Sequence, residues 1–126
     1  MRRILIIDDD ERLATAAARA FRVRGYEALV TTTPFGFTKM INEYKPDLVL
    51  VDVKMPALSG DSLVRVVRNA EKRHPCLLVF WSAKHPDKLR EMAKRTEADG
   101  YISKSEDSDA LVRKVRELLD AAAPTS

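Results

Sequence analysis

Short apolar runs alternate with amphipathic stretches along the whole chain. Five runs are typical of strands: residues 3–7, 26–31, 48–51, 76–81 and 100–103. The stretches between and after them repeat apolar residues every three to four positions, which predicts helices over 10–25, 34–44, 61–73, 86–98 and 107–123. The runs 3–7, 48–51 and 76–81 are apolar throughout, as expected for strands that helices cover on both faces. The pattern predicts an α/β fold with an open parallel sheet.

Composition narrows the class of protein without naming a function. The chain has 126 residues, a normal length for one domain, and 45% of them are hydrophobic. Its 22 basic and 19 acidic residues leave a formal net charge of +3, which does not demand a nucleic acid partner. We expect a domain over residues 1–120, followed by a tail or the start of a linker over 121–126.

Cysteine content and hydropathy point to a cytoplasmic protein. The single cysteine, Cys76, cannot form an internal disulfide and is expected as a buried thiol at the start of a strand. No apolar run approaches the roughly 20 residues that a membrane-spanning helix needs. The two arginines near the start precede an apolar stretch that is too short for a signal peptide.

Polar side chains follow four of the five predicted strands, where each strand ends. Asp8 and Asp9 follow the first strand, Asp52 the third, Ser82 the fourth and Lys104 the fifth. In an open parallel sheet the carboxyl ends of the strands form the edge at which ligands bind. We therefore expect three carboxylates, one hydroxyl and one lysine to converge on one edge.

This set of side chains suits phosphoryl transfer. Neighbouring carboxylates repel one another unless a cation lies among them, and oxygen ligands suit Mg²⁺. A lysine adds a point charge for an anion. A carboxylate can act as the nucleophile that forms an aspartyl phosphate, while metal and lysine neutralise charge on the transferring group.

Four short segments resemble the response-regulator receiver domain of two-component signalling, in the form of the small chemotaxis regulators. They are "ILIIDDD", "LVLVDVKMPALSG", "VFWSA" and "DGYISK", and the resemblance covers roughly residues 2–120. It implies a flavodoxin-like, doubly wound, five-stranded parallel sheet of order 2-1-3-4-5 with five helices. By position, it implies that Asp52 is the phosphoacceptor and that Asp8, Asp9 and Asp52 bind Mg²⁺ together with the backbone carbonyl of Lys54.

The resemblance also assigns the remaining site residues. Lys104 would contact the phosphoryl oxygens, and Ser82 and Tyr101 would form the switch. Ala83 leaves room beside Asp52, and Lys54 and Lys84 would modulate the lifetime of the phosphoryl group. The only chemistry expected is self-phosphorylation and self-dephosphorylation on Asp52.

The family also implies partners. These would be a histidine kinase or phosphotransfer protein, a downstream protein target or fused output domain, and a second copy bound through the last two strand–helix units. Direct contact of this domain with nucleic acid or membrane is not expected.

One departure from the family pattern leaves alternatives open. Ser105 stands where the family usually has proline after the lysine, so the Lys104–Ser105 peptide is not expected to favour the cis form.

Bulky or charged residues beside the site would also affect it. Lys54 and Lys84 would slow self-dephosphorylation by pairing with the phosphoryl group or obstructing water. Phe80 and Trp81 are bulky, and we expect one to pack in the core and the other to crowd Tyr101.

Two other functions fit parts of the pattern. A degenerate receiver would bind a protein partner without phosphorylation. A phosphatase of the haloacid-dehalogenase type would use the Asp-x-Asp spacing of Asp8 and Asp10, although Arg12 and the short chain disfavour it.

Overall fold

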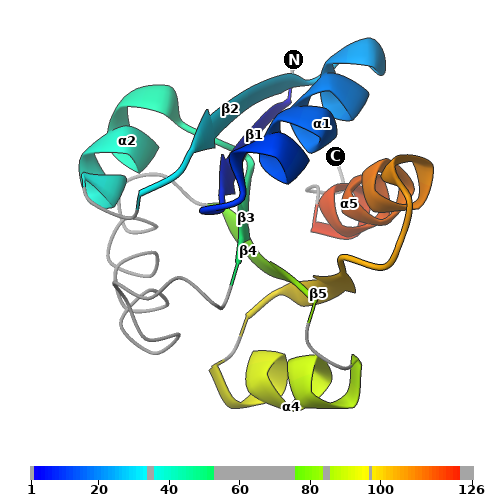
Figure 1. Ribbon diagram of the computed structural model, residues 1–126. Coiled ribbons are helices and arrows are strands. Elements are labelled where there is room, and N and C mark those ends of the chain that lie inside the picture. Colours follow the sequence, from blue (N-terminus) through cyan, green and yellow to red (C-terminus); the bar gives the residue numbers. More distant parts are fainter. Residues whose placement is uncertain (1, 34–35, 53–75, 84–85, 97, 123–126) are drawn as a thin grey trace.

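The computed structural model describes residues 2–33, 36–52, 76–83, 86–96 and 98–122 (Figure 1). The strands are β1 (Arg3–Ile7), β2 (Glu27–Thr31), β3 (Leu48–Val51), β4 (Leu77–Ser82) and β5 (Gly100–Ser103). The helices are α1 (Glu11–Val23), α2 (Phe37–Tyr44), α4 (Pro86–Thr96) and α5 (Ser108–Ala122). Each begins and ends within three residues of its predicted range. The helix predicted over 61–73 lies outside the described residues.

All five strands form one parallel sheet in the order β2-β1-β3-β4-β5. This confirms the flavodoxin-like order that the family resemblance implied. Since β1 and β3 lie side by side at the centre, and β4 follows, the carboxyl ends of these three strands are adjacent. The predicted site residues are therefore brought to one edge.

Helices cover both faces of the sheet (Figure 1). On one face α1 and α5 pack against alternate strand residues, among them Ile4, Ile6 and Trp81. On the other face α2 and α4 supply Ile41 and Ala93. There they meet the intervening strand residues, such as Leu5, Ile7, Val49, Val51 and Phe80. Alternation along each strand explains why the runs are apolar throughout, because successive side chains enter opposite cores.

Local signals define the ends of α1. The side chain of Asp10 accepts a hydrogen bond from the backbone N–H of Leu13 (3.2 Å), which caps the helix. Gly25, with φ +88°, follows the helix in the left-handed conformation that favours glycine. The first strand and first helix are thus joined by a short acidic loop, and this loop carries Asp8 and Asp9.

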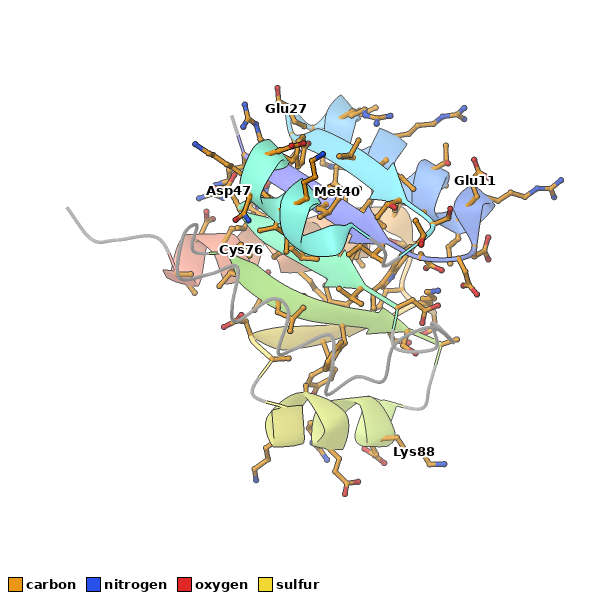
Figure 2. All side chains as sticks on the ribbon, turned by 90° about the vertical axis from the view of Figure 1, so that its left-hand side faces the viewer. Glu11, Glu27, Met40, Asp47, Cys76 and Lys88 are labelled. Atoms are coloured by element: carbon orange, nitrogen blue, oxygen red, sulfur yellow. The ribbon has the colours of Figure 1, made fainter. Side chains whose placement is uncertain are left out.

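One prediction about the surroundings of the sheet is also confirmed, because Cys76, directly before β4, is buried. Within the described residues, no helix combines the length and hydropathy that crossing a bilayer requires. Lys88 on α4 points away from the sheet (Figure 2), and Arg90 and Lys94 are exposed on the same helix. These three basic side chains therefore form part of a solvated face of α4, with Arg90 3.6 Å from Asp87.

Candidate functional site

Backbone hydrogen bonds to neighbouring strands place the predicted site residues. The N–H of Asp52 donates to the carbonyl of Ile7 (3.0 Å), so Asp52 continues the pairing of β3 with β1. In the same way the N–H of Asp8 donates to Thr31 (3.1 Å) and that of Lys104 to Ser82 (2.8 Å). Each residue is one position beyond its strand, and a hydrogen bond from its backbone N–H to a neighbouring strand holds it at the edge of the sheet.

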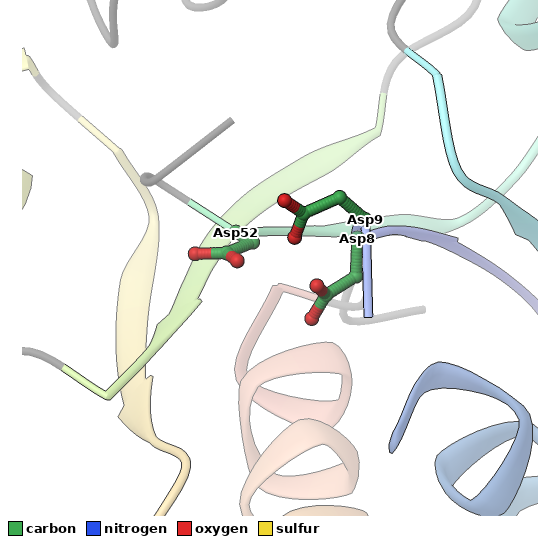
Figure 3. Close-up of side chains that lie close together, drawn as sticks. All are labelled: Asp8, Asp9 and Asp52. Carbon is green, nitrogen blue, oxygen red and sulfur yellow. The ribbon is translucent and has the colours of Figure 1, made fainter. Parts of the chain in front are cut away.

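Three carboxylates lie together at this edge. Figure 3 shows the side chains of Asp8, Asp9 and Asp52 beside the ends of β1 and β3. One oxygen from each lies within 4.8 Å of the others. Asp8 and Asp52 are buried, whereas Asp9 is exposed. The edge predicted from the strand order is therefore a cluster of negative charge with one side open to solvent.

Lys104 lies against the two buried carboxylates. Its Nζ is 2.6 Å from Oδ2 of Asp8 and 3.2 Å from Oδ2 of Asp52. Only 11% of the lysine side chain is exposed, so water screens these ion pairs weakly. A single lysine thus compensates part of the charge of three aspartates.

Burial and charge shift the pKa values of this pair. Burial raises the pKa of Asp8 above its ordinary value, and neither Lys104 nor the backbone N–H of Asp10 cancels that effect. For Lys104, burial acts to lower the pKa, but hydrogen bonding and attraction from Asp8 and Asp52 outweigh it and the pKa is raised. Lys104 is therefore a cation at neutral pH, and its ion pairs stabilise the fold until the pH rises through that raised pKa.

The donor set fits a hard divalent cation. Among the described residues, no donor has hydrogen-bonding geometry toward the buried Oδ2 of Asp8, although that atom is ion-paired with Lys104. Its other oxygen accepts from the N–H of Asp10 (2.9 Å). A buried carboxylate oxygen with spare acceptor capacity, beside two further carboxylates, suits Mg²⁺. Lys54, the predicted carbonyl ligand, lies outside the described residues.

The other predicted site residues differ in burial. Ser82 is fully buried and is the last residue of β4, rather than the first residue beyond it. Ala83 is exposed beside it. Tyr101 on β5 is 39% exposed, so its ring lies partly in solvent. Lys84 lies outside the described residues.

Core packing, expected for one of the two bulky residues before Ser82, is found for both. Both Phe80 and Trp81 are buried, on opposite faces of the sheet. Phe80 pairs in register with Tyr101, whereas Trp81 pairs with Ile102. The ring of Trp81 lies under Lys104, with Nζ 5.1 Å from the ring centroid. Sequence reasoning missed this contact, and the only signal for it was an aromatic residue next to a predicted site residue.

A second unpredicted feature is the turn after Lys104. The Oγ atoms of Ser103 and Ser105 are 2.8 Å apart, and the N–H of Ser105 donates to Oγ of Ser103 (3.2 Å). Within the described part of the chain every peptide bond is trans, that between Lys104 and Ser105 included. The serine that replaces the family's proline is thus part of a local hydrogen-bonded turn.

Curated response regulators are similar to this chain in sequence. The chain is 32% identical over 114 residues to the DNA-binding response regulator MtrA of Mycolicibacterium paratuberculosis, covering 90% of this chain and 49% of MtrA. It is 29% identical over 121 residues to the phosphate regulon transcriptional regulatory protein PhoB of Pseudomonas aeruginosa, covering 96% of this chain and 53% of PhoB. The chain therefore spans about half the length of these curated relatives.

A solved structure and a family model both match this chain over most of its length. The crystal structure of a response regulator receiver protein from Burkholderia phymatum superposes with a TM-score of 0.79 at 27% identity, covering 99% of this chain and all of that one. The family model of the response regulator receiver domain matches residues 4–116, which contain the five strands except Arg3 of β1, and the three clustered carboxylates. The chain belongs to the response regulator receiver domain family of two-component systems.

Proposed function

We propose that this receiver domain accepts a phosphoryl group on Asp52 with the help of Mg²⁺. The observation that carries the proposal is the cluster of Asp8, Asp9 and Asp52 around one point, with Lys104 on the two buried members. A carboxylate nucleophile, ligands for a hard cation and a lysine are the groups that aspartyl phosphate formation needs.

In the proposed reaction a carboxylate oxygen of Asp52 attacks the phosphorus of a phosphohistidine or a small phosphodonor. The bond from phosphorus to the donor's leaving atom breaks, and that atom leaves with the bonding electron pair. The bound ion would neutralise charge on the phosphoryl oxygens. Asp8 and Asp9 would hold it, with the Lys54 carbonyl as a further ligand.

Lys104 and Ser82 would then respond to the new dianion. Lys104 already lies 3.2 Å from Oδ2 of Asp52, so a small movement of its flexible stem brings Nζ to the phosphoryl oxygens. Ser82 supplies a buried hydroxyl at the end of β4, and Tyr101 has a partly exposed ring that can turn inward. Lys54, Ala83 and Lys84 would tune the lifetime of the acyl phosphate.

The partners follow from this chemistry. The donor would be a histidine kinase or a phosphotransfer protein, and the recipient a downstream protein or a fused output domain. A second copy would bind through β4, α4, β5 and α5.

We further propose that residues 1–120 form the receiver domain and that 121–126 begin a tail or linker.

The test is phosphorylation by a small-molecule phosphodonor with Mg²⁺, followed by intact-protein mass spectrometry. We expect the gain of one acid-labile phosphoryl group, and its loss in Asp52→Asn. Asp120→Asn is the matched control, because Asp120 is an exposed carboxylate ion-paired with Arg2 away from the site. This variant should be labelled like the wild type.

The outcomes separate the alternatives. Failure of the wild type to gain a phosphoryl group, with the fold intact, would favour a binding module that works without phosphorylation. Multiple turnover of the phosphodonor that requires Asp8 and survives Asp52→Asn would favour a phosphatase.

A further inference from the structure

Lys104 contacts an aromatic ring as well as two carboxylates. Its Nζ lies 5.1 Å from the centroid of Trp81, within the roughly 6 Å over which a cation is attracted to a ring face. Trp81 is 3% exposed and the lysine side chain 11% exposed. Cation–π contacts are strongest when both groups are removed from water in this way.

The ring is held more firmly than the lysine. Trp81 lies on β4, inside the sheet, and packs in the core that α1 and α5 cover. Its neighbour in register is Ile102, which is also buried. The lysine stem has four rotatable bonds and its Nζ can move among its partners. The indole is therefore the fixed side of this contact.

Trp81 also differs from the other partners of Lys104 in charge. Asp8 and Asp52 would be shared with the metal ion, and Asp52 would be consumed as the nucleophile. A divalent cation that binds these oxygens competes directly with the ammonium group for them. The neutral indole ring does not bind Mg²⁺, so its attraction for Lys104 persists when the carboxylates are occupied.

We propose that Trp81 is a positioning residue that keeps the Lys104 ammonium group at the site while the carboxylates hold the metal. The proposal rests on the proposed function and adds a residue to it that carries no reacting atom. Trp81 acts through Lys104, which then meets the phosphoryl oxygens from a fixed direction.

The kinetic test compares Trp81→Leu and Trp81→Phe with Phe80→Leu at saturating Mg²⁺. Phe80 is the matched control, because it is buried on the opposite face of the same strand, away from Lys104. Trp81→Leu should lower the maximal rate of phosphorylation roughly three- to tenfold and change the KM for the phosphodonor little, whereas Trp81→Phe should recover most of the rate. Phe80→Leu should keep the wild-type rate.

A second measurement does not depend on activity or on changing the tryptophan. Trp81 is the sole tryptophan, so its fluorescence reports on its own surroundings. With Mg²⁺ bound, the wild type and Lys104→Met should differ in emission, because the ammonium group remains over the ring only in the wild type. Lys114→Met, at a partly buried lysine paired with Glu106, is the control and should match the wild type.

Identical emission of the wild type and Lys104→Met would overturn the proposal, and so would a Trp81→Leu variant that is phosphorylated at the wild-type maximal rate. The proposed function fails in a different way, since the wild type itself would then gain no phosphoryl group. The fluorescence comparison still applies if Trp81→Leu does not fold.

Discussion

Asp8 is a buried carboxylate that we propose as a ligand of a divalent cation. It is fully buried, and burial raises its pKa, so folding favours the protonated form of this carboxyl group relative to an ordinary aspartate. The same residue offers an oxygen toward the cluster that accepts no hydrogen bond among the described residues. A divalent cation at that oxygen favours the ionised form. Metal binding and proton binding at Asp8 therefore oppose each other.

We predict that Mg²⁺ affinity weakens as the pH falls, and that it begins to do so at a higher pH than an ordinary aspartate would cause. Because the pKa of Asp8 is raised, a proton occupies the carboxylate more readily and must leave before the metal binds. Once the pH is below that pKa, each further unit should cost about tenfold in affinity. Calorimetric Mg²⁺ titrations at several pH values measure this.

Asp8→Asn is the informative variant for this dependence. It should bind Mg²⁺ more weakly at neutral pH and lose the part of the pH dependence that Asp8 causes. Equal Mg²⁺ affinity of the wild type across the acidic range would contradict the assignment of Asp8 as a ligand.

At the scale of elements, the turn between β5 and α5 holds Lys104. Ser103 Oγ bonds to both the hydroxyl and the N–H of Ser105, and Glu106 pairs with Lys114 on α5 (2.6 Å). Asp107 then accepts a hydrogen bond from the N–H of Ala110 (2.8 Å) at the start of α5. The turn is stabilised by side chains that bond to neighbours within a few residues.

Ser103→Ala should destabilise the protein more than Ser105→Ala does. The first substitution removes both hydrogen bonds of the Ser103 hydroxyl and leaves the N–H of Ser105 without its acceptor, whereas the second removes only the bond between hydroxyls. We expect a loss of about 0.5–1.5 kcal/mol for Ser103→Ala and a smaller one for Ser105→Ala. Urea unfolding measures both, and an equal loss in the two variants would argue against a role of Ser103 in the turn.

At the scale of the whole molecule, the sheet gathers three carboxylates at one edge and sets Lys104 against two of them. Three strands deliver Asp8, Asp52 and Lys104 to one edge through backbone hydrogen bonds. The exposed Asp9 adds a third carboxylate to the cluster. An unfolded chain separates the three carboxylates, so a cation that needs Asp8, Asp9 and Asp52 together binds only the folded state.

Mg²⁺ should therefore raise the free energy of unfolding of the whole domain. A ligand that binds only the folded state stabilises it by about 2.7 kcal/mol at a concentration 100-fold above its Kd. Urea unfolding in excess Mg²⁺, compared with chelator at matched ionic strength, measures the difference. We expect Asp8→Asn to lose most of the gain, and a wild type that unfolds identically in both buffers would count against the metal site.

The sequence by itself determined the elements and the identity of the groups at the strand ends. Apolar runs such as 48–51 and helix signals such as Asp10 and Gly25 are local, because they depend on spacing and on backbone preferences of single residues. These local signals predicted every strand and helix that the structure describes. The edge location of Asp8, Asp52 and Lys104 also followed, since parallel strands end on one side.

Only the tertiary structure decided what Lys104 touches and on which face Trp81 lies. The spacing of residues along one strand does not say how far a flexible lysine reaches across its neighbours. It also does not say which of two adjacent aromatic residues faces α5. The pairing of β4 with β5 and the packing of α5 made that choice, because they place Trp81 and Ile102 in one core and Phe80 in the other. The contact between Lys104 and Trp81 is a product of that arrangement.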